Sequence, residues 1–287
     1  MEHTFETAGH MRLELRIPAG SIRIRAEQTS QTQLSISGER SPEDFRIVFE
    51  DIRPGEHHLT VEYRERGKLF GWRGTEMRVE LTVPLGTDVV CDTGSADLEV
   101  NGGIGSLTFR SGSGDCRFDD VEGDLTVKVA SGDMAGATVG GGFTFNSASG
   151  DARAREIGGD LTAKSASGDL SFGTVGGSVR LATVSGDVEI GSVSVGSASV
   201  RAVSGDVEIG VARGTRVYLD ISSTSGDAVS ELEMSEESAG DGADLELQVG
   251  TVSGDIRIVR SRAGGPSASA TGWSEEVYAA EDSASSE

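Results

Sequence analysis

The stretch Ser167-Gly-Asp-Leu-Ser-Phe-Gly-Thr-Val-Gly-Gly-Ser-Val-Arg-Leu-Ala-Thr-Val-Ser185-Gly-Asp-Val-Glu-Ile190 decides the fold of this chain. It runs from one Ser-Gly-Asp triplet through the next. After each triplet a polar residue stands between two apolar ones, first as Leu170 and Phe172, then as Val188 and Ile190. This alternation is the two-residue period of a strand with one buried face. The stretch therefore predicts short strands separated by glycine turns.

The triplet recurs along most of the chain. Its starts are Ser113, Ser131, Ser149, Ser167, Ser185, Ser204, Ser225 and Ser253, and a variant, Ser95-Ala96-Asp97, precedes them. From Ser95 onward the intervals are 18, 18, 18, 18, 18, 19, 21 and 28 residues. A fixed period of this length is the signature of a repeat architecture in which each unit stacks on its neighbours.

Each unit contains a second strand signal. Gly123-Asp-Leu-Thr-Val127 repeats the small, apolar, polar, apolar order of the first half, so one coil holds two short strands. Ordering the backbone costs roughly 1 kcal/mol per residue, and a lone coil cannot recover that cost from its few inward side chains. Stacking at about 4.8 Å adds a hydrogen-bond ladder between coils. We therefore predict an all-β fold, a parallel β-solenoid or β-helix with 18-residue coils, and few or no helices.

The repeat divides the chain into three parts. Residues 1–88 lack the period but alternate like strands, and we expect a β-rich N-terminal cap there; residues 89–260 form the solenoid. Residues 261–287 are acidic and rich in Ser and Ala, which predicts a disordered tail, and Ser230–Asp244 reads as an acidic insertion. The strands expected in the cap are Met11–Ile17, Ser21–Ala26, Gln33–Ser37, Phe45–Phe49, His58–Tyr63 and Met77–Val83.

The formal net charge of -22 bears on the possible partners. Binding to nucleic acid depends on a basic surface that releases counterions from phosphates, so we expect no nucleic-acid partner. An anionic membrane surface is disfavoured for the same reason. The sequence shows neither a signal-peptide pattern nor an apolar run of membrane-spanning length, which predicts a cytoplasmic protein without a membrane span.

The repeated aspartates invite two interpretations. Asp115, Asp133, Asp151, Asp169 and Asp187 could form a calcium-binding ladder, because calcium prefers carboxylate oxygens. However, calcium needs six to eight oxygen ligands and each half-coil offers at most one aspartate. The alternative is structural: the Ser and Asp side chains accept hydrogen bonds from turn amides while Gly supplies unusual backbone angles. We favour the structural interpretation.

No catalytic constellation accompanies the repeat. The four histidines all lie within the first 58 residues, and neither a zinc-protease motif, a phosphate loop nor a nucleophile elbow is found. We therefore predict that the chain is not an enzyme, has no cofactor and takes no small-molecule substrate. Cys91 and Cys116 should be inward-facing free thiols in coils two apart, too distant for a disulfide.

A partner-binding candidate lies in the N-terminal region. Lys68, Leu69, Phe70, Trp72 and Arg73 stand in a glycine-rich turn context. Exposed aromatic side chains beside basic ones anchor many interfaces. The competing interpretation is that this turn folds back onto its own domain.

The segments Ser165-Ala-Ser-Gly-Asp-Leu170, Thr183-Val-Ser-Gly-Asp-Val-Glu-Ile190 and Met77-Arg-Val-Glu-Leu-Thr-Val-Pro-Leu-Gly-Thr-Asp-Val-Val90 carry a family resemblance. The chain resembles the bacterial putative-adhesin family of β-strand repeats, a domain of unknown function. The resemblance implies the solenoid fold over the chain to about Arg260, and the family name implies surface adhesion.

We expect a non-enzymatic structural or scaffolding protein that self-associates end to end, as bactofilin solenoids do, or binds a protein partner. The alternative is an adhesin-like or calcium-dependent ligand-binding module.

Overall fold

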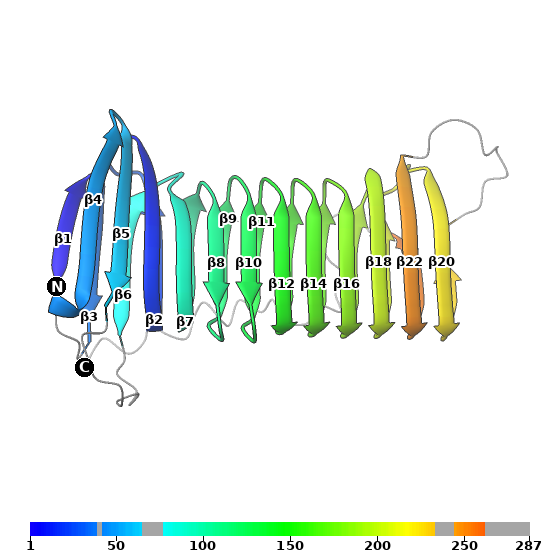
Figure 1. Ribbon diagram of the computed structural model, residues 1–287. Helices are drawn as coiled ribbons and strands as arrows, with labels where there is room; N and C mark the ends of the chain where they lie inside the picture. The colour runs from blue at the N-terminus through cyan, green and yellow to red at the C-terminus, as the bar shows by residue number, and fades with distance from the viewer. Residues whose placement is uncertain (39–41, 65–76, 233–243, 262–287) are drawn as a thin grey trace, which may run out of the picture.

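The computed structural model describes residues 1–38, 42–64, 77–232 and 244–261. Within these ranges the chain is almost entirely strand, and the one helical segment is the 3₁₀ turn η1 (Pro42–Asp44). The strands form two walls of a flattened solenoid, joined by turns along both long edges (Figure 1). The prediction of an all-β parallel solenoid is confirmed.

Each coil adds one strand to each wall. The front wall, which faces the viewer in Figure 1, contains β8 (Leu107–Ser111), β10 (Leu125–Val129), β12 (Phe143–Ser149), β14 (Leu161–Ser167), β16 (Val179–Ser185), β18 (Gly196–Ser204), β22 (Leu245–Ser253) and β20 (Val217–Ser225). The back wall contains β9 (Cys116–Val121), β11 (Met134–Val139), β13 (Ala152–Ile157), β15 (Leu170–Val175), β17 (Val188–Val193), β19 (Val207–Val211), β23 (Ile256–Arg260) and β21 (Ala228–Ser230).

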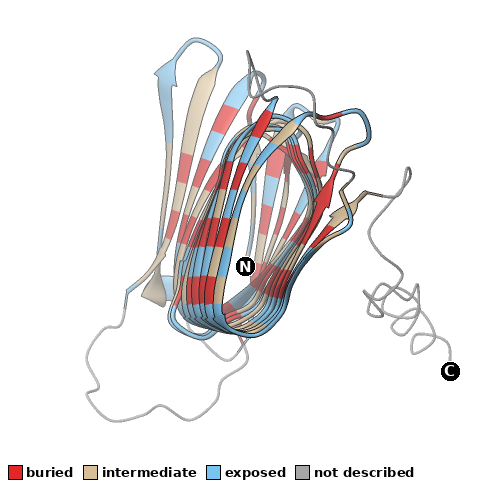
Figure 2. Cartoon of the chain, turned by 90° about the vertical axis from the view of Figure 1, so that its right-hand side faces the viewer, coloured by how far each residue is buried: buried red, intermediate tan, exposed pale blue. Residues whose placement is uncertain are grey.

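The strands of each wall pair in parallel, with equivalent positions of successive units opposite one another. Leu161 pairs with Val179 in the front wall, and Leu170 pairs with Val188 in the back wall. The apolar residues after each triplet point inward as predicted: Val188 and Ile190 are each 1% exposed. Buried residues line the inner sides of both walls in the view along the axis (Figure 2).

The space between the walls is filled by side chains of complementary size. Phe118 occupies an inward position of β9, and the equivalent residue of the next back-wall strand is Gly136. A side chain at Gly136 would collide with the Phe118 ring, so the repeat departs from its apolar pattern there. Phe143 and Phe172 contact each other across the core with ring centroids 5.8 Å apart.

Parallel stacking begins before the first Ser-Gly-Asp unit. β2 (His10–Glu27) and β7 (Asp88–Ile104) are long strands that bend around one edge, so that each contributes to both walls. They pair in parallel along most of their length, from Arg12 with Asp88 to Arg25 with Asn101. β2 therefore forms a complete coil without the triplet.

Antiparallel strands close the N-terminal end. In the front wall β5 (Glu56–Tyr63) pairs with β2 and then with β4 (Phe45–Arg53). In the back wall β6 (Arg78–Pro84) is followed by β3 (Gln31–Ser37) and β1 (Glu2–Glu6). The strands predicted in this region are confirmed, except that Met11–Ile17 and Ser21–Ala26 belong to one continuous strand, β2; β1 was not predicted.

Aromatic rings fill the space between the two edges of this end. Phe5 of β1 stacks on Phe49 of β4 with ring centroids 4.9 Å apart, and Phe49 stacks on His57. Residues from both walls therefore contact each other over the N-terminal end of the core, where Phe5 and Phe49 are partly buried.

At the other end the coils are not stacked in chain order. β22 lies between β18 and β20 in the front wall, and β23 lies between β19 and β21 in the back wall (Figure 1). The coil formed by β20 and β21 is thus the last in space although β22 and β23 follow it in sequence. Most of the acidic insertion predicted at Ser230–Asp244, residues 233–243, lies outside the described residues.

The side chains explain this order. The inserted coil carries Leu245, Leu247, Ile256 and Ile258, all no more than 1% exposed. The terminal coil offers smaller residues in the back wall, Ala228 and Ser230. Because burying a large aliphatic side chain contributes about 1.5 to 3 kcal/mol, placing the richer coil inside and the poorer one at the end lowers the free energy of the fold.

Candidate interaction surfaces

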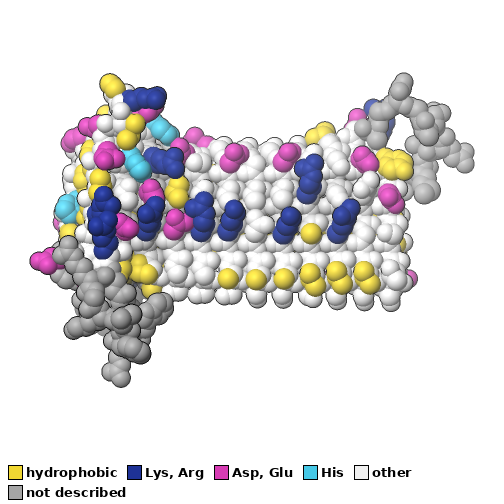
Figure 3. Space-filling model, viewed as in Figure 1, with side chains coloured by type: hydrophobic (Ala, Val, Ile, Leu, Met, Phe, Trp, Pro, Cys, Tyr) yellow, Lys and Arg dark blue, Asp and Glu magenta, His cyan; other side chains and the backbone are white. Residues whose placement is uncertain are grey.

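A row of charged side chains crosses the outer face of the front wall. Strand pairing, antiparallel between β4 and β5 and parallel from there on, places outward residues of successive strands side by side. Their spatial order is Arg46, Glu62, Arg16, Asp92, Arg110, Lys128, Asn146, Lys164, Ala182 and Arg201. The row runs perpendicular to the strands through the middle of this face (Figure 3). We call it the cationic row.

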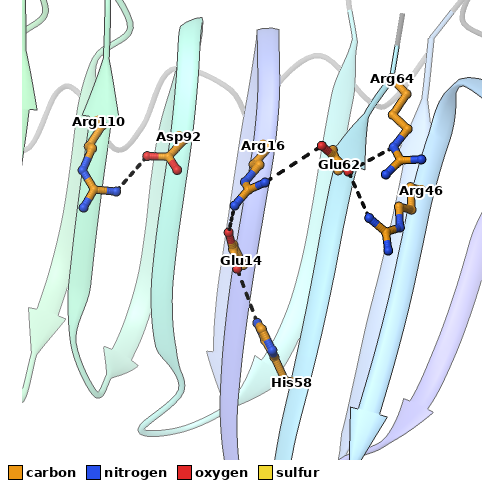
Figure 4. A network of polar contacts seen from close by, with 8 residues as sticks. All are labelled: Glu14, Arg16, Arg46, His58, Glu62, Arg64, Asp92 and Arg110. Carbon is orange, nitrogen blue, oxygen red and sulfur yellow. Dashed lines mark hydrogen bonds and ion pairs between the residues drawn. The ribbon is translucent and has the colours of Figure 1, made fainter. Parts of the chain in front are cut away.

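In the N-terminal half of the row, cations alternate with anions. Glu62 makes ion pairs with Arg46 at 3.7 Å, with Arg64 at 3.1 Å and with Arg16 at 4.0 Å (Figure 4). Asp92 and Arg110 are paired at 3.0 Å. These exposed pairs largely neutralise one another, so this half presents little net charge.

In the C-terminal half the anions are missing. Lys128, Lys164 and Arg201 are exposed and make no ion pair within the described part of the chain. Arg180, on the adjacent outward position of β16, is likewise exposed and has none there. A molecule of net charge -22 thus keeps a line of uncompensated cations on one wall.

An apolar row runs beside the cationic row. It consists of the residue before the serine of each triplet, at Ala130, Ala148, Ala166, Val184, Val203 and Val252. The three valines are 52%, 48% and 52% exposed. A line of hydrophobic side chains is visible below the cations in Figure 3. On the other side of the cations, Thr108, Thr126, Thr144 and Thr162 form a hydroxyl row.

The aspartates of the triplets form a continuous hydrogen-bond ladder along one edge. The Oδ1 atom of Asp169 accepts a hydrogen bond from the backbone N–H of Asp187 at 2.9 Å. The same contact, at 2.8 to 3.0 Å, links Asp97, Asp115, Asp133, Asp151, Asp169, Asp187, Asp206, Asp255 and Asp227 in spatial order. The ladder follows the strand order of the C-terminal end, passing through Asp255 before Asp227.

This geometry refines the structural interpretation of the motif. The aspartate does accept a backbone amide, but the amide belongs to the next coil rather than to its own turn. The glycine is required twice over: Gly168 has a φ of 129°, and a side chain there would collide with the carbonyl of Gly150. In the described residues the serine hydroxyls of the triplets form no corresponding ladder.

The described residues contain no group of three or more His, Cys, Asp or Glu side chains that could hold a metal ion. The five aspartates considered for calcium lie in the hydrogen-bond ladder, one per coil. The calcium interpretation remains a prediction that a titration can test.

The two cysteines are free and buried, as predicted. The structure places them in adjacent coils, not two coils apart: Cys91 pairs with Phe109 in the front wall, and Cys116 pairs with Leu98 in the back wall. The earlier count was wrong because β7 supplies both walls of one coil. Burial raises the pKa of the Cys116 thiol to about 12, so the thiolate is scarcely populated at neutral pH.

The terminal coil leaves an open end. In the front wall, β20 pairs with one edge of β22. In the described part of the chain no strand pairs with the other, outer edge of β20. Val217, Leu219 and Ile221 of β20 are only partly buried, and Tyr218 on the outer face is 61% exposed. Among the described residues, this end has no counterpart to the Phe5–Phe49 stack at the N-terminal end.

A shallow groove of about 310 Å³ lies over the N-terminal strands. Its lining includes Glu2, Thr4, Arg23, Arg25, Gln33 and Glu80. Arg23 makes ion pairs with Glu80 and Glu99. Burial alone would raise the pKa of Glu99, but hydrogen bonds from Arg23 and Asn101 lower this pKa below its usual value. Two of the charged residues that line the groove, Arg23 and Glu80, are thus paired with each other.

The partner-binding candidates predicted from the sequence, Lys68, Leu69, Phe70, Trp72 and Arg73, lie outside the described residues. The sequence reasoning missed the cationic row. A signal was present, because Arg110, Lys128 and Lys164 each stand fifteen residues after the serine of their unit.

The fold defines a β-solenoid repeat protein. The chain belongs to the Toastrack DUF4097 family, whose model matches residues 10–269. The resemblance to a bacterial putative-adhesin domain of unknown function is thereby confirmed. No curated protein matches the chain.

Several solved structures are similar over most of the chain. A "putative adhesin" from Bacteroides fragilis shares 10% identity, covers 90% of this chain and 96% of its own, and has a TM-score of 0.46. A "putative adhesin" from Parabacteroides distasonis gives the same identity and coverages with a TM-score of 0.42. A "putative lipid binding protein" from Parabacteroides distasonis shares 15% identity, covers 91% of this chain and 96% of its own, and has a TM-score of 0.42. Among the described residues no helix has the length and apolarity to cross a membrane.

Proposed function

We propose that this chain is a non-enzymatic scaffold that associates with a second copy of itself through the C-terminal end of the solenoid. The observation that carries the proposal is the terminal strand β20. Its inward side chains Val217, Leu219 and Ile221 are only partly buried, and its outer backbone edge has no partner strand in the described part of the chain. An exposed edge of this kind is a template for pairing with another chain.

The two ends differ in a way that favours pairing of like ends. At the N-terminal end antiparallel strands and the Phe5–Phe49 stack cover the core. At the C-terminal end the described residues contain no further strand beyond the coil of β20 and β21. Two copies related by a twofold axis could pair β20 with β20 and thereby cover both sets of apolar side chains, which gives a closed dimer instead of a filament.

Sedimentation equilibrium of the full chain over a range of concentrations tests this proposal. We expect a monomer–dimer equilibrium that Leu219→Lys and Ile221→Lys shift to monomer, because each places a charge among the side chains that the dimer would bury. Tyr218→Lys is the matched control, since it adds the same charge on the outer face of the same strand. A wild-type chain that stays monomeric at every concentration would refute self-association, as would equal effects of the inward and outward lysines.

We further propose a cytoplasmic location. The two cysteines are free and buried, a usage typical of reducing compartments. Adhesion is the alternative role that the family suggests. Antibody labelling of intact and permeabilised cells separates the two: labelling only after permeabilisation supports the cytoplasmic scaffold, whereas labelling of intact cells supports an adhesin.

A further inference from the structure

We propose that the front wall binds an acidic protein segment that lies lengthwise along the solenoid, with carboxylates on the cationic row and apolar side chains on the row of valines. This surface is separate from the C-terminal end through which the chain is proposed to self-associate.

The charge pattern is the first argument. The cations from Lys128 to Arg201 have no anionic partner among the described residues, whereas those nearer the N-terminus alternate with anions. Two anions that recur in the repeat, Asp124 and Asp160, lie at the turn before the strand, and each accepts a backbone N–H of the next coil at 2.8 Å. Charges within about 8 Å dominate at physiological salt, so a ligand on this row experiences local attraction despite the negative net charge.

The shape of the surface is the second argument. Parallel strands about 4.8 Å apart place Lys128 and Arg201 four steps apart, so the uncompensated part of the row extends over roughly 19 Å in a straight line. The row is one side chain wide. A linear ligand fits this geometry, whereas a flat bilayer would also meet the acidic ladder along the edge.

The apolar row indicates which class of linear ligand fits the surface. Val184, Val203 and Val252 lie in adjacent strands, with their side chains about half exposed. An anionic polysaccharide or a single-stranded nucleic acid would form ion pairs with the cations but has no aliphatic side chains to pack against the valines. An acidic peptide with interspersed apolar residues satisfies both rows, which is the charge complementarity and desolvated apolar contact found at specific interfaces.

Binding to the full-length protein can be measured by fluorescence anisotropy with a labelled peptide of Glu-Glu-Leu repeats. We expect the triple variant Lys128→Ser, Lys164→Ser, Arg201→Ser to raise the Kd by about tenfold or more. The matched control is Arg117→Ser, Arg153→Ser, Arg257→Ser, which removes the same charge from the back wall. It should change the Kd by less than about twofold. Absence of binding, or equal effects of the two triple variants, would overturn the proposal.

A second variant tests the apolar row. Val184→Thr, Val203→Thr, Val252→Thr keeps the β-branched shape at exposed positions, so the fold should persist, as circular dichroism can verify. It should weaken binding of the Glu-Glu-Leu peptide by about threefold to fivefold and leave binding of poly-glutamate unchanged. Tighter binding of heparin or of anionic phosphatidylglycerol vesicles than of the peptide would identify a polysaccharide or membrane ligand and would refute the protein segment.

Discussion

The carboxylate of Asp169 shows what one residue contributes to every coil. It accepts the N–H of Asp187, whose own carboxylate accepts an amide of the next coil. Neighbouring carboxylates at this spacing repel one another by about 1 kcal/mol or less in water. A hydrogen bond to a charged acceptor contributes about 1.5 to 3 kcal/mol. The ladder is therefore stabilising despite the repetition of like charges.

We predict that Asp169→Ala destabilises the solenoid by about 1 kcal/mol, because it removes the acceptor of an exposed amide that water can partly replace. Asp169→Asn keeps an oxygen at the same place and relieves repulsion, so it should melt within about a degree of the wild type. Thermal melts of both variants provide the measurement. The calcium interpretation predicts instead that a chelator lowers the melting temperature of the wild type and that both variants abolish this sensitivity.

The sequence predicted which residues face the core but not how the polar ones are paired. The alternation of Leu170, Ser171 and Phe172 was sufficient to orient the strand, because burial follows from side-chain chemistry and a two-residue period. The donor for Asp169 could not be predicted, because an amide of its own turn and the amide of Asp187 in the next coil, 18 residues away, both come within reach of the carboxylate once the coils stack. The cationic row could not be predicted either. Its prediction requires knowing whether anions lie beside Lys128 and Lys164, and this depends on the register of the strands.

At the scale of the elements, the irregular intervals of the repeat now have a physical cause. The connection from β19 to β20, residues 212–216, spans the coil formed by β22 and β23, which lies between these two strands in space. The interval between the triplets at Ser204 and Ser225 is accordingly 21 residues instead of 18. The following interval of 28 residues belongs to the chain that returns to the inserted coil. The sequence indicated a change in the spacing of the triplets. It did not indicate the strand order, because the longer spacing is equally compatible with coils stacked in chain order and joined by a protruding loop.

Pairs of engineered cysteines can test the strand order. Ser199 and Gln248 are direct partners on the outer face of β18 and β22, whereas Asp220 of β20 pairs with Gln248 on its other side. We predict that Ser199→Cys with Gln248→Cys forms a disulfide under mild oxidation, because neighbouring strands lie about 4.8 Å apart.

The control pair, Ser199→Cys with Asp220→Cys, should remain reduced, because two strand spacings of about 9.6 Å exceed the reach of a disulfide. Gel mobility without reductant distinguishes the two. Stacking in chain order would give the reverse result, with the control pair cross-linked and the first pair reduced.

At the scale of the whole molecule, stability arises between neighbouring coils, so the two ends determine where the solenoid opens first. The N-terminal end is closed by strands from both walls, with Phe5 and Phe49 in contact. In the described part of the chain no strand follows the last coil at the C-terminal end, where Val217 and Leu219 are only partly buried. Local opening should therefore proceed from the C-terminal end, in spatial order and not in chain order.

Hydrogen exchange at low protein concentration tests this directly. We predict that amides of β20, Val217–Ser225, exchange faster than those of β22, Leu245–Ser253, because among the described strands β22 has hydrogen-bonded partners on both sides and β20 has one. At high concentration, pairing of two C-terminal ends should slow exchange in β20 while leaving β22 nearly unchanged. Faster exchange in β22 than in β20 would contradict the insertion, since a coil that ends the solenoid must be the first to open. Protection of β20 that does not depend on concentration would instead contradict the dimer.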